Sequence, residues 1–151
     1  MLIQHVNRTD PERVFIMVDN GEAASLPADA VVIWETTTDA NGLQVIQPDT
    51  GKLWGFAGVL DVSMASATGN YTLAQCYGYR ASSIVFQTDT SVAAGEPLVP
   101  VAGQNYFDSI ATTTASNAAV TLQPIYGVLL ASIASSAASA TLSRKIFIRG
   151  M

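Results

Sequence analysis

Few side chains in this sequence are of the types that carry out acid–base or nucleophilic chemistry. There is one histidine, His5, and one cysteine, Cys76. A Cys/His zinc site needs three or four such ligands, which one copy of this chain does not supply. Ser–His–Asp catalysis would need His5 as its base, and no nucleophile motif lies near that residue. We interpret Cys76 as a small buried hydrophobe and predict that the protein is not an enzyme.

Acidic side chains are more plentiful, but most of them flank turn residues. Asp39-Ala40-Asn41-Gly42 matches a fragment of a calcium-binding loop, whose twelfth position should be a bidentate glutamate. That position, counted from Asp39, is Thr50, and we therefore interpret the segment as a turn. The sequence contains no phosphate-binding glycine motif, and it identifies no acid pair of the kind that glycoside hydrolysis needs. We predict no catalytic residue, no metal-binding residue, no cofactor-binding residue and no cofactor.

Aromatic side chains offer one other chemistry, the stacking of sugar rings. The candidates for such a carbohydrate site are Trp34, Trp54, Tyr71, Tyr77, Tyr79 and Tyr126. We favour the interpretation that they belong to the core and to cross-strand pairs, because rings of this size usually go to the interior. A carbohydrate-binding β-sandwich module stays an alternative. A cluster of exposed aromatics with polar neighbours would distinguish it.

The elements that position these residues are predicted to be strands. Runs of β-branched and aromatic residues are punctuated by Gly, Pro, Asn and Asp, which is typical of a barrel or sandwich. The runs lie at residues 13–18, 30–34, 43–47, 54–62, 71–80, 83–87, 98–101, 120–123, 125–133 and 141–149. The Asn41-Gly42 turn would join two of them into a hairpin. Gly55 and Gly58 are candidates for bulges or close backbone approach.

We therefore predict an all-β fold, a single antiparallel β-barrel or β-sandwich with little helix. Residues 1–151 are expected to form one β domain, because one domain is the default at this length. An extended N-terminal arm is expected at about residues 1–12. The alanine-rich residues 131–140 are the one helix candidate, and their serines weaken it.

Charge is sparse, at 13% of residues against about 25% in typical soluble domains. Such a surface suits a chain that is covered by partners or by copies of itself. The net charge of −5 argues against nucleic-acid binding, which uses clustered Lys and Arg. No stretch has the roughly 20 predominantly apolar residues of a membrane-spanning helix, and the N-terminus lacks the pattern of a signal peptide. We predict no nucleic-acid partner, no membrane partner and no Sec-type export.

The charges are also unevenly placed along the chain. Residues 1–52 hold eight acids and three bases, whereas residues 53–143 hold only five charges. The last eight residues hold three bases, Arg144, Lys145 and Arg149. We expect residues 53–143, including the neutral segment 111–117, to supply most contacts to other proteins, because neutral side chains are desolvated more easily than ions. The acidic first third would face solvent more, and the basic end would meet an acidic surface of its own N-terminal third or of a neighbour.

Two later segments carry a resemblance to a known family. They are Val92-Ala93-Ala94-Gly95-Glu96-Pro97-Leu98-Val99-Pro100-Val101 and Pro124-Ile125-Tyr126-Gly127-Val128-Leu129-Leu130-Ala131-Ser132-Ile133. Together they resemble the small capsid decoration, or cement, proteins of tailed bacteriophages, in which a turn with Gly-x-Pro-Leu is followed by a Gly-Val strand late in the chain. The matching residues are Gly95, Pro97, Leu98, Gly127 and Val128. The resemblance is confined to residues 92–133.

The resemblance implies a structural virion protein without a cofactor or catalysis. Such proteins bind the outside of an assembled capsid, often as trimers, and stabilise it against internal DNA pressure. The implied partners are the major capsid protein and sister copies in a homotrimer. The implied location is the capsid exterior of the virion, after synthesis in the host cytoplasm. The alternative within this class is another virion subunit, such as a head-fibre base, a tail subunit or an adaptor protein.

Overall fold

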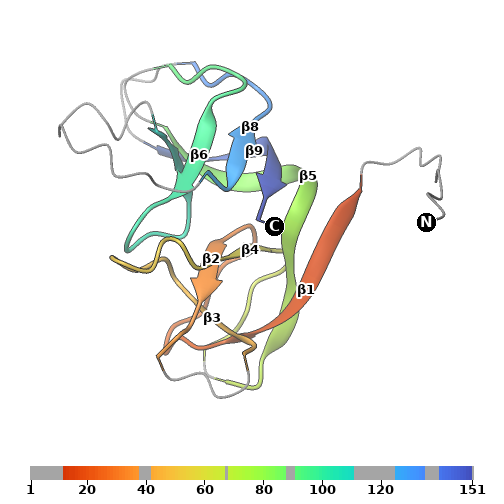
Figure 1. Cartoon of the computed structure of the whole chain (residues 1–151), viewed down its shortest axis with the longest axis vertical. Helices are drawn as coiled ribbons and strands as arrows, with labels where there is room; N and C mark the ends of the chain where they lie inside the picture. Colours follow the sequence, from red (N-terminus) through yellow and green to blue (C-terminus); the bar gives the residue numbers. More distant parts are fainter. Residues whose placement is uncertain are drawn as a thin grey trace, which may run out of the picture.

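The protein is built from strands and connecting loops, as Figure 1 shows for the computed structural model. The structure describes residues 12–37, 42–66, 68–87, 91–110, 125–134 and 140–150. The strands are β1 (Arg13–Asn20), β2 (Val31–Trp34), β3 (Gln44–Ile46), β4 (Phe56–Leu60), β5 (Tyr71–Gln87), β6 (Pro97–Pro100), β7 (Phe107–Ser109), β8 (Gly127–Leu129) and β9 (Ala140–Arg149). The prediction of an all-β fold with little helix is confirmed.

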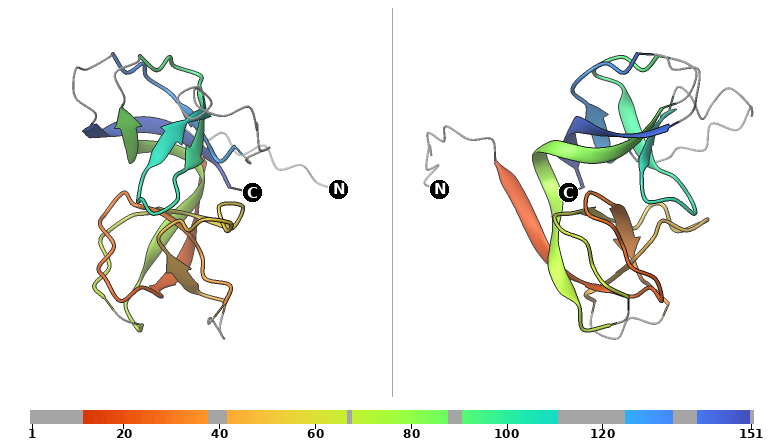
Figure 2. Two further views of the ribbon diagram at one scale, coloured as in Figure 1. Left: turned by 90° about the vertical axis from the view of Figure 1, so that its left-hand side faces the viewer. Right: turned by 180° about the vertical axis from the view of Figure 1, so that it is seen from behind.

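The strands form one hydrogen-bonded sheet that closes on itself twice. β1, β3, β2, β4 and the first half of β5 make one closed ring, because β5 pairs with both β4 and β1. The second half of β5 makes another ring with β7, β6, β8 and β9, because β5 also pairs with β7 and β9. We call these the N-terminal ring and the C-terminal ring. Figure 2 shows them one above the other, with β5 running through both.

Two hydrophobic cores lie on the two sides of β2 and β4. Val31 and Val59 pack into the core of the C-terminal ring, whereas Val32 and Leu60 pack into the core of the N-terminal ring. Alternate residues of a strand point to opposite faces, and all of β4 is buried. The two rings therefore share β2 and β4 as a wall between their cores.

Most strand pairs are antiparallel, and the predicted hairpin is one of them, because Ile33 of β2 pairs with Ile46 of β3. Two pairs are parallel, β1 with β3 and β5 with β7. The two predicted runs at residues 71–80 and 83–87 form the single strand β5, with a register shift between Arg80 and Ser83. The bend that separates the two runs in sequence is the place where β5 passes from one ring to the other.

Asp19-Asn20-Gly21 follows the predicted run 13–18 and is a sequence typical of turns, but the strand extends into it. β1 continues through Asp19 and Asn20, which pair with β3 at Gln44 and Val45. The Asn20 side chain then organises the following loop, since its amide group donates to the carbonyl oxygens of Ala24 and Ala65 at 3.0 and 2.6 Å. Pairing with β3 therefore determines where β1 ends, and the Asn20 side chain stabilises the loop that follows.

Close backbone approach, predicted for Gly55 and Gly58, is confirmed most clearly at Gly58. A Cβ atom added there would lie 2.8 Å from the carbonyl oxygen of Gln75 on β5. At Gly55 the nearest atom would be the carbonyl oxygen of Lys52, at 3.3 Å. Only glycine at position 58 lets β4 and β5 approach this closely.

Several expectations lie outside the described residues. They concern the N-terminal arm up to residue 11, the neutral segment 111–117, the apolar run 120–123 and residues 39–41 of the predicted turn. Of the helix candidate at residues 131–140, the described part 131–134 is not helical, and Ile133 forms a β-bridge with Val92. Across the described ranges, no helix has the length and apolar character that crossing a bilayer would require.

Candidate functional site

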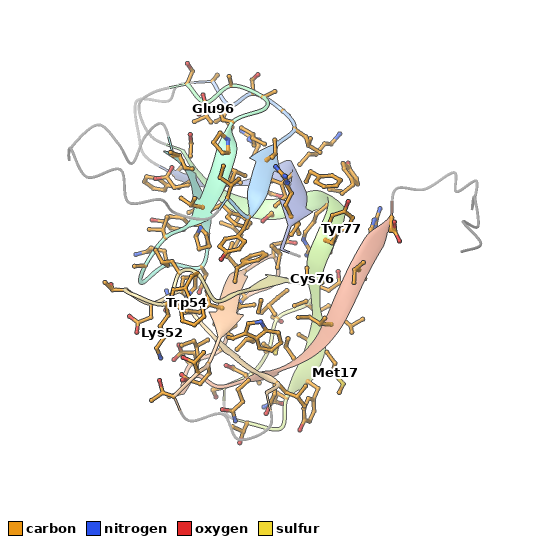
Figure 3. All side chains as sticks on the ribbon, in the orientation of Figure 1. Met17, Lys52, Trp54, Cys76, Tyr77 and Glu96 are labelled. Atoms are coloured by element: carbon orange, nitrogen blue, oxygen red, sulfur yellow. The ribbon has the colours of Figure 1, made fainter. Side chains whose placement is uncertain are left out.

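Cys76 lies in the middle of β5 (Figure 3), where it is 5% exposed, as expected for a buried hydrophobe. Its thiol donates a hydrogen bond to the carbonyl oxygen of Val14 on β1, at 3.4 Å. Burial raises the pKa of the Cys76 thiol. A raised pKa leaves less thiolate near neutral pH, and thiolate is the reactive form.

We expect Cys76 in the folded protein to react with a chromogenic disulfide reagent at least about tenfold more slowly than in the urea-unfolded chain. Both burial and the raised pKa act in this direction. The matched control is a Cys76→Ala variant that carries Ala24→Cys, because Ala24 is exposed. That control should react at similar rates folded and unfolded. Equal rates for Cys76 itself in the two states would contradict its burial.

The other residues considered for acid–base or metal chemistry cannot be placed. His5 lies outside the described residues, and so do Asp39, Ala40 and Asn41. Within the described ranges, we find no group of three or more His, Cys, Asp and Glu side chains that could hold a metal ion.

The six candidate aromatics fall into separate groups. Trp34 packs against the core of the N-terminal ring, and Tyr126 stacks on Phe56 with ring centroids 4.7 Å apart. Tyr126 also donates a hydrogen bond to the carbonyl oxygen of Trp54, and burial raises its pKa. Tyr71 is exposed at the start of β5. The partly buried pair Tyr77 and Tyr79 lies further along that strand.

Trp54 is the most exposed large hydrophobic residue that the structure describes, at 64%. Its indole nitrogen donates to the carbonyl oxygen of Gly51 at 3.0 Å, which fixes the ring near the β3–β4 loop. Lys52 of the same loop pairs with Glu35 at 3.5 Å. Asp49, at the start of the loop, is exposed. We call Trp54, Lys52, Glu35 and Asp49 the Trp54 face.

A buried arginine that carries no sequence motif joins the two rings. Arg80 lies at the bend of β5 and is 7% exposed. One terminal nitrogen donates to the Asp29 carboxylate and to the Leu60 carbonyl oxygen, both at 2.6 Å. Its Nε atom donates to the carbonyl oxygen of Ser82 at 2.6 Å, and the other terminal nitrogen lies 3.6 Å from Asp61. The guanidinium group therefore ties β5 to the loops that precede β2 and follow β4.

The partners of Arg80 are themselves held in place. The Ser82 hydroxyl donates to the second oxygen of Asp29 at 2.6 Å. Gln75 is buried, and its amide group donates to the carbonyl oxygens of Tyr77 and Tyr79. The pocket beside this network has a volume of about 220 Å³ and is lined by Arg13, Phe15, Asp29, Asp61, Gln75, Arg80, Ala81 and Ser82. With its charges paired internally, the network is suited to fixing the bend of β5 rather than to acid–base chemistry.

An exposed apolar face covers the outside of the β1–β5 ribbon. Phe15 and Met17 alternate along β1 and are 37% and 53% exposed. Leu73 of β5 is 46% exposed and pairs directly with Met17, and Tyr71 is 56% exposed two residues earlier. Directly opposed residues of two paired strands share a face. We call Phe15, Met17, Tyr71 and Leu73 the β1–β5 face.

This face adjoins a cluster of bases and aromatic rings. The Arg13 guanidinium lies over the Tyr79 ring, 5.8 Å from its centre. Tyr77 packs edge-on against Phe147 of β9 at 5.4 Å and pairs in register with Arg149. Neither Lys145 nor Arg149 forms an ion pair with any acid in the described part of the chain.

We expected an adhesive middle of the chain and an acidic first third that faces solvent. The first third also carries exposed apolar side chains, and some of its acids are engaged in the fold. Phe15 and Met17, half of the β1–β5 face, belong to the first third of the chain. Several acids of that third are engaged in the fold. Asp19 is buried and accepts a hydrogen bond from the amide of Gly69, and Asp29 pairs with Arg80.

These residues make an exposed surface, in which apolar side chains lie beside bases without an ion-pair partner among the described acids. No protein-family model matches the chain, and no curated protein matches it either.

Proposed function

We propose that the protein is a non-enzymatic structural virion protein, which binds the outside of an assembled phage capsid and stabilises it. One observation carries most of the support. The two segments that resemble decoration proteins are far apart in sequence but pair with each other: Leu98 of β6 lies opposite Gly127 of β8. The amide of Gly95 also donates to the carbonyl oxygen of Leu129 at 2.7 Å. The two quoted segments therefore form one continuous β unit of the fold.

The surface adds further support. Exposed apolar side chains gathered on one sheet face mark an interaction site, and the β1–β5 face has this character. In the proposed role, the partners are the major capsid protein and sister copies, associated as a homotrimer. The protein is made in the host cytoplasm and ends on the exterior of the virion. It uses no cofactor and binds neither nucleic acid nor membrane.

The role can be tested on phage heads that lack this protein. We expect such heads to assemble but to release their DNA at a lower temperature than complete heads, because the bound protein stabilises the shell it binds. Adding the purified protein back should restore the release temperature, whereas an unrelated acidic protein should not. Release is followed by the fluorescence of a DNA-binding dye during heating. If heads with and without the protein release DNA at the same temperature, the stabilising role is wrong.

A carbohydrate-binding role is a second candidate, supported by Trp54. An exposed indole beside the paired Lys52 and Glu35 combines a stacking surface with hydrogen-bonding groups. Glycan-array binding that disappears in Trp54→Ala would favour this role.

Co-sedimentation with heads distinguishes a decoration protein from a tail subunit, because a tail subunit would not remain with purified heads.

A further inference from the structure

We propose that copies of this chain associate head to tail, the β1–β5 face of one copy binding the Trp54 face of the next. This inference deepens the proposed function, because it names the two faces through which sister copies would meet.

The first half of the interface is apolar with a basic border. Phe15, Met17, Tyr71 and Leu73 offer a continuous apolar surface across the paired strands β1 and β5. Charge is segregated around it. Apart from the buried and internally paired Arg80, the strands β1, β5 and β9 hold four bases, Arg13, Arg144, Lys145 and Arg149, and one acid, Asp19, which is buried. Two exposed acids lie in this region: Asp61, which is 3.6 Å from Arg80, and Glu12, which precedes Arg13 in the sequence.

The second half of the interface is apolar with an acidic border. Trp54 is exposed, Lys52 of its loop pairs with Glu35 at 3.5 Å, and Asp49 of the same loop is exposed. Glu22 lies next to the start of this loop, because its carboxylate accepts a hydrogen bond from the amide of Gln47, two residues before Asp49. An exposed tryptophan is the side chain most typical of a binding hot spot.

The two faces are complementary, but they cannot meet within one copy. Figure 3 shows Trp54 and Lys52 on one side of the molecule, and Met17 and Tyr77 on the other. A symmetric contact between two β1–β5 faces would bring the same basic border, with Arg13, against itself. A contact between unlike faces instead opposes basic and acidic borders, and such head-to-tail contacts generate closed rings when the rotation permits.

The test uses two variants, each of which disables one face. Met17→Glu/Leu73→Glu alters the β1–β5 face, and Trp54→Ala alters the Trp54 face. We expect each variant alone to weaken self-association about 30-fold or more in sedimentation velocity, as is typical for hot-spot residues. An equimolar mixture of the two should form a 1:1 dimer, because it retains one intact pair of unlike faces. Raising the salt from about 0.05 M to about 0.5 M should weaken association of the wild-type chain, because salt screens the charged borders.

The control is Ala94→Glu, which adds a charge in the turn before β6, near Glu96 and away from both faces (Figure 3). It should associate like the wild-type chain. A wild-type chain that stays monomeric would overturn the inference. So would a mixture of the two variants that does not pair, or a Trp54→Ala variant that still self-associates. Head binding is measured separately: a chain that self-associates through these faces but does not bind heads would contradict only the proposed function.

Discussion

Replacing Arg80 with methionine is expected to lower the free energy of unfolding by about 3 kcal/mol. The change removes a buried guanidinium group and leaves the Asp29 carboxylate without its ion-pair partner. It also leaves the carbonyl oxygens of Leu60 and Ser82 without the donors they have in the wild-type fold. Asp29 keeps 27% of its side-chain exposure, which places the expected loss at the lower end of the range for broken buried pairs. Urea unfolding followed by tryptophan fluorescence measures the change.

Arg144→Met is the matched control. Arg144 lies on β9, opposite Ser83, and forms no ion pair with a described residue. Its loss should therefore cost no more than about 1 kcal/mol. The loss of unfolding free energy in Arg80→Lys should lie between the losses in Arg80→Met and Arg144→Met. Lysine keeps the charge but lacks the planar guanidinium group that reaches several acceptors. Equal losses for Arg80→Met and Arg144→Met would show that the network around Arg80 does not stabilise the fold.

The sequence predicts most of the strands because their β-branched runs stand between strong turn residues, as at β1, β2 and β9. It does not predict β7, because Phe107-Asp108-Ser109 is short and two of its three residues are polar. This segment becomes a strand only through its neighbours, since Phe107 pairs with Val85 and Ser109 pairs with Leu98. The closure of two rings cannot be predicted from the sequence for a similar reason. It depends on which distant strands pair, and no local pattern in β5 indicates that this strand pairs in both rings.

The proposed binding surface is only partly predictable from the sequence. The basic C-terminal end and the sparse charge are visible in it. The β1–β5 face is not, because β1 is apolar at both alternating sets of positions. Ile16 and Val18 pack inward, whereas Phe15 and Met17 point outward, and period-2 alternation cannot distinguish two sets that are both apolar. Arg80 is missed because its carboxylate partner Asp29 is 51 residues away.

Gly78→Ala is expected to lower the free energy of unfolding by more than about 3 kcal/mol, or to prevent soluble folding. Gly78 lies in β5 where the strand leaves the N-terminal ring, and it pairs with both Arg13 and Ile148. Its φ is +98°, and a Cβ atom there would lie 1.9 Å from the carbonyl oxygen of Glu12. The alanine would therefore combine backbone strain with a clash against main-chain atoms, which cannot turn aside as a flexible side chain can.

Gly95→Ala separates these two costs. Gly95 has nearly the same φ, +93°, but no atom lies within 4 Å of an added Cβ. The free energy of unfolding of this variant should therefore fall by only about 1–2 kcal/mol, which is the cost of the left-handed conformation. The excess loss in Gly78→Ala then measures how tightly β1 must approach β5 at the bend. Equal losses for the two variants would show that β1 moves away without cost and that the two rings do not depend on this contact. If Gly78→Ala is insoluble while Gly95→Ala folds normally, the contact at the bend is required for folding.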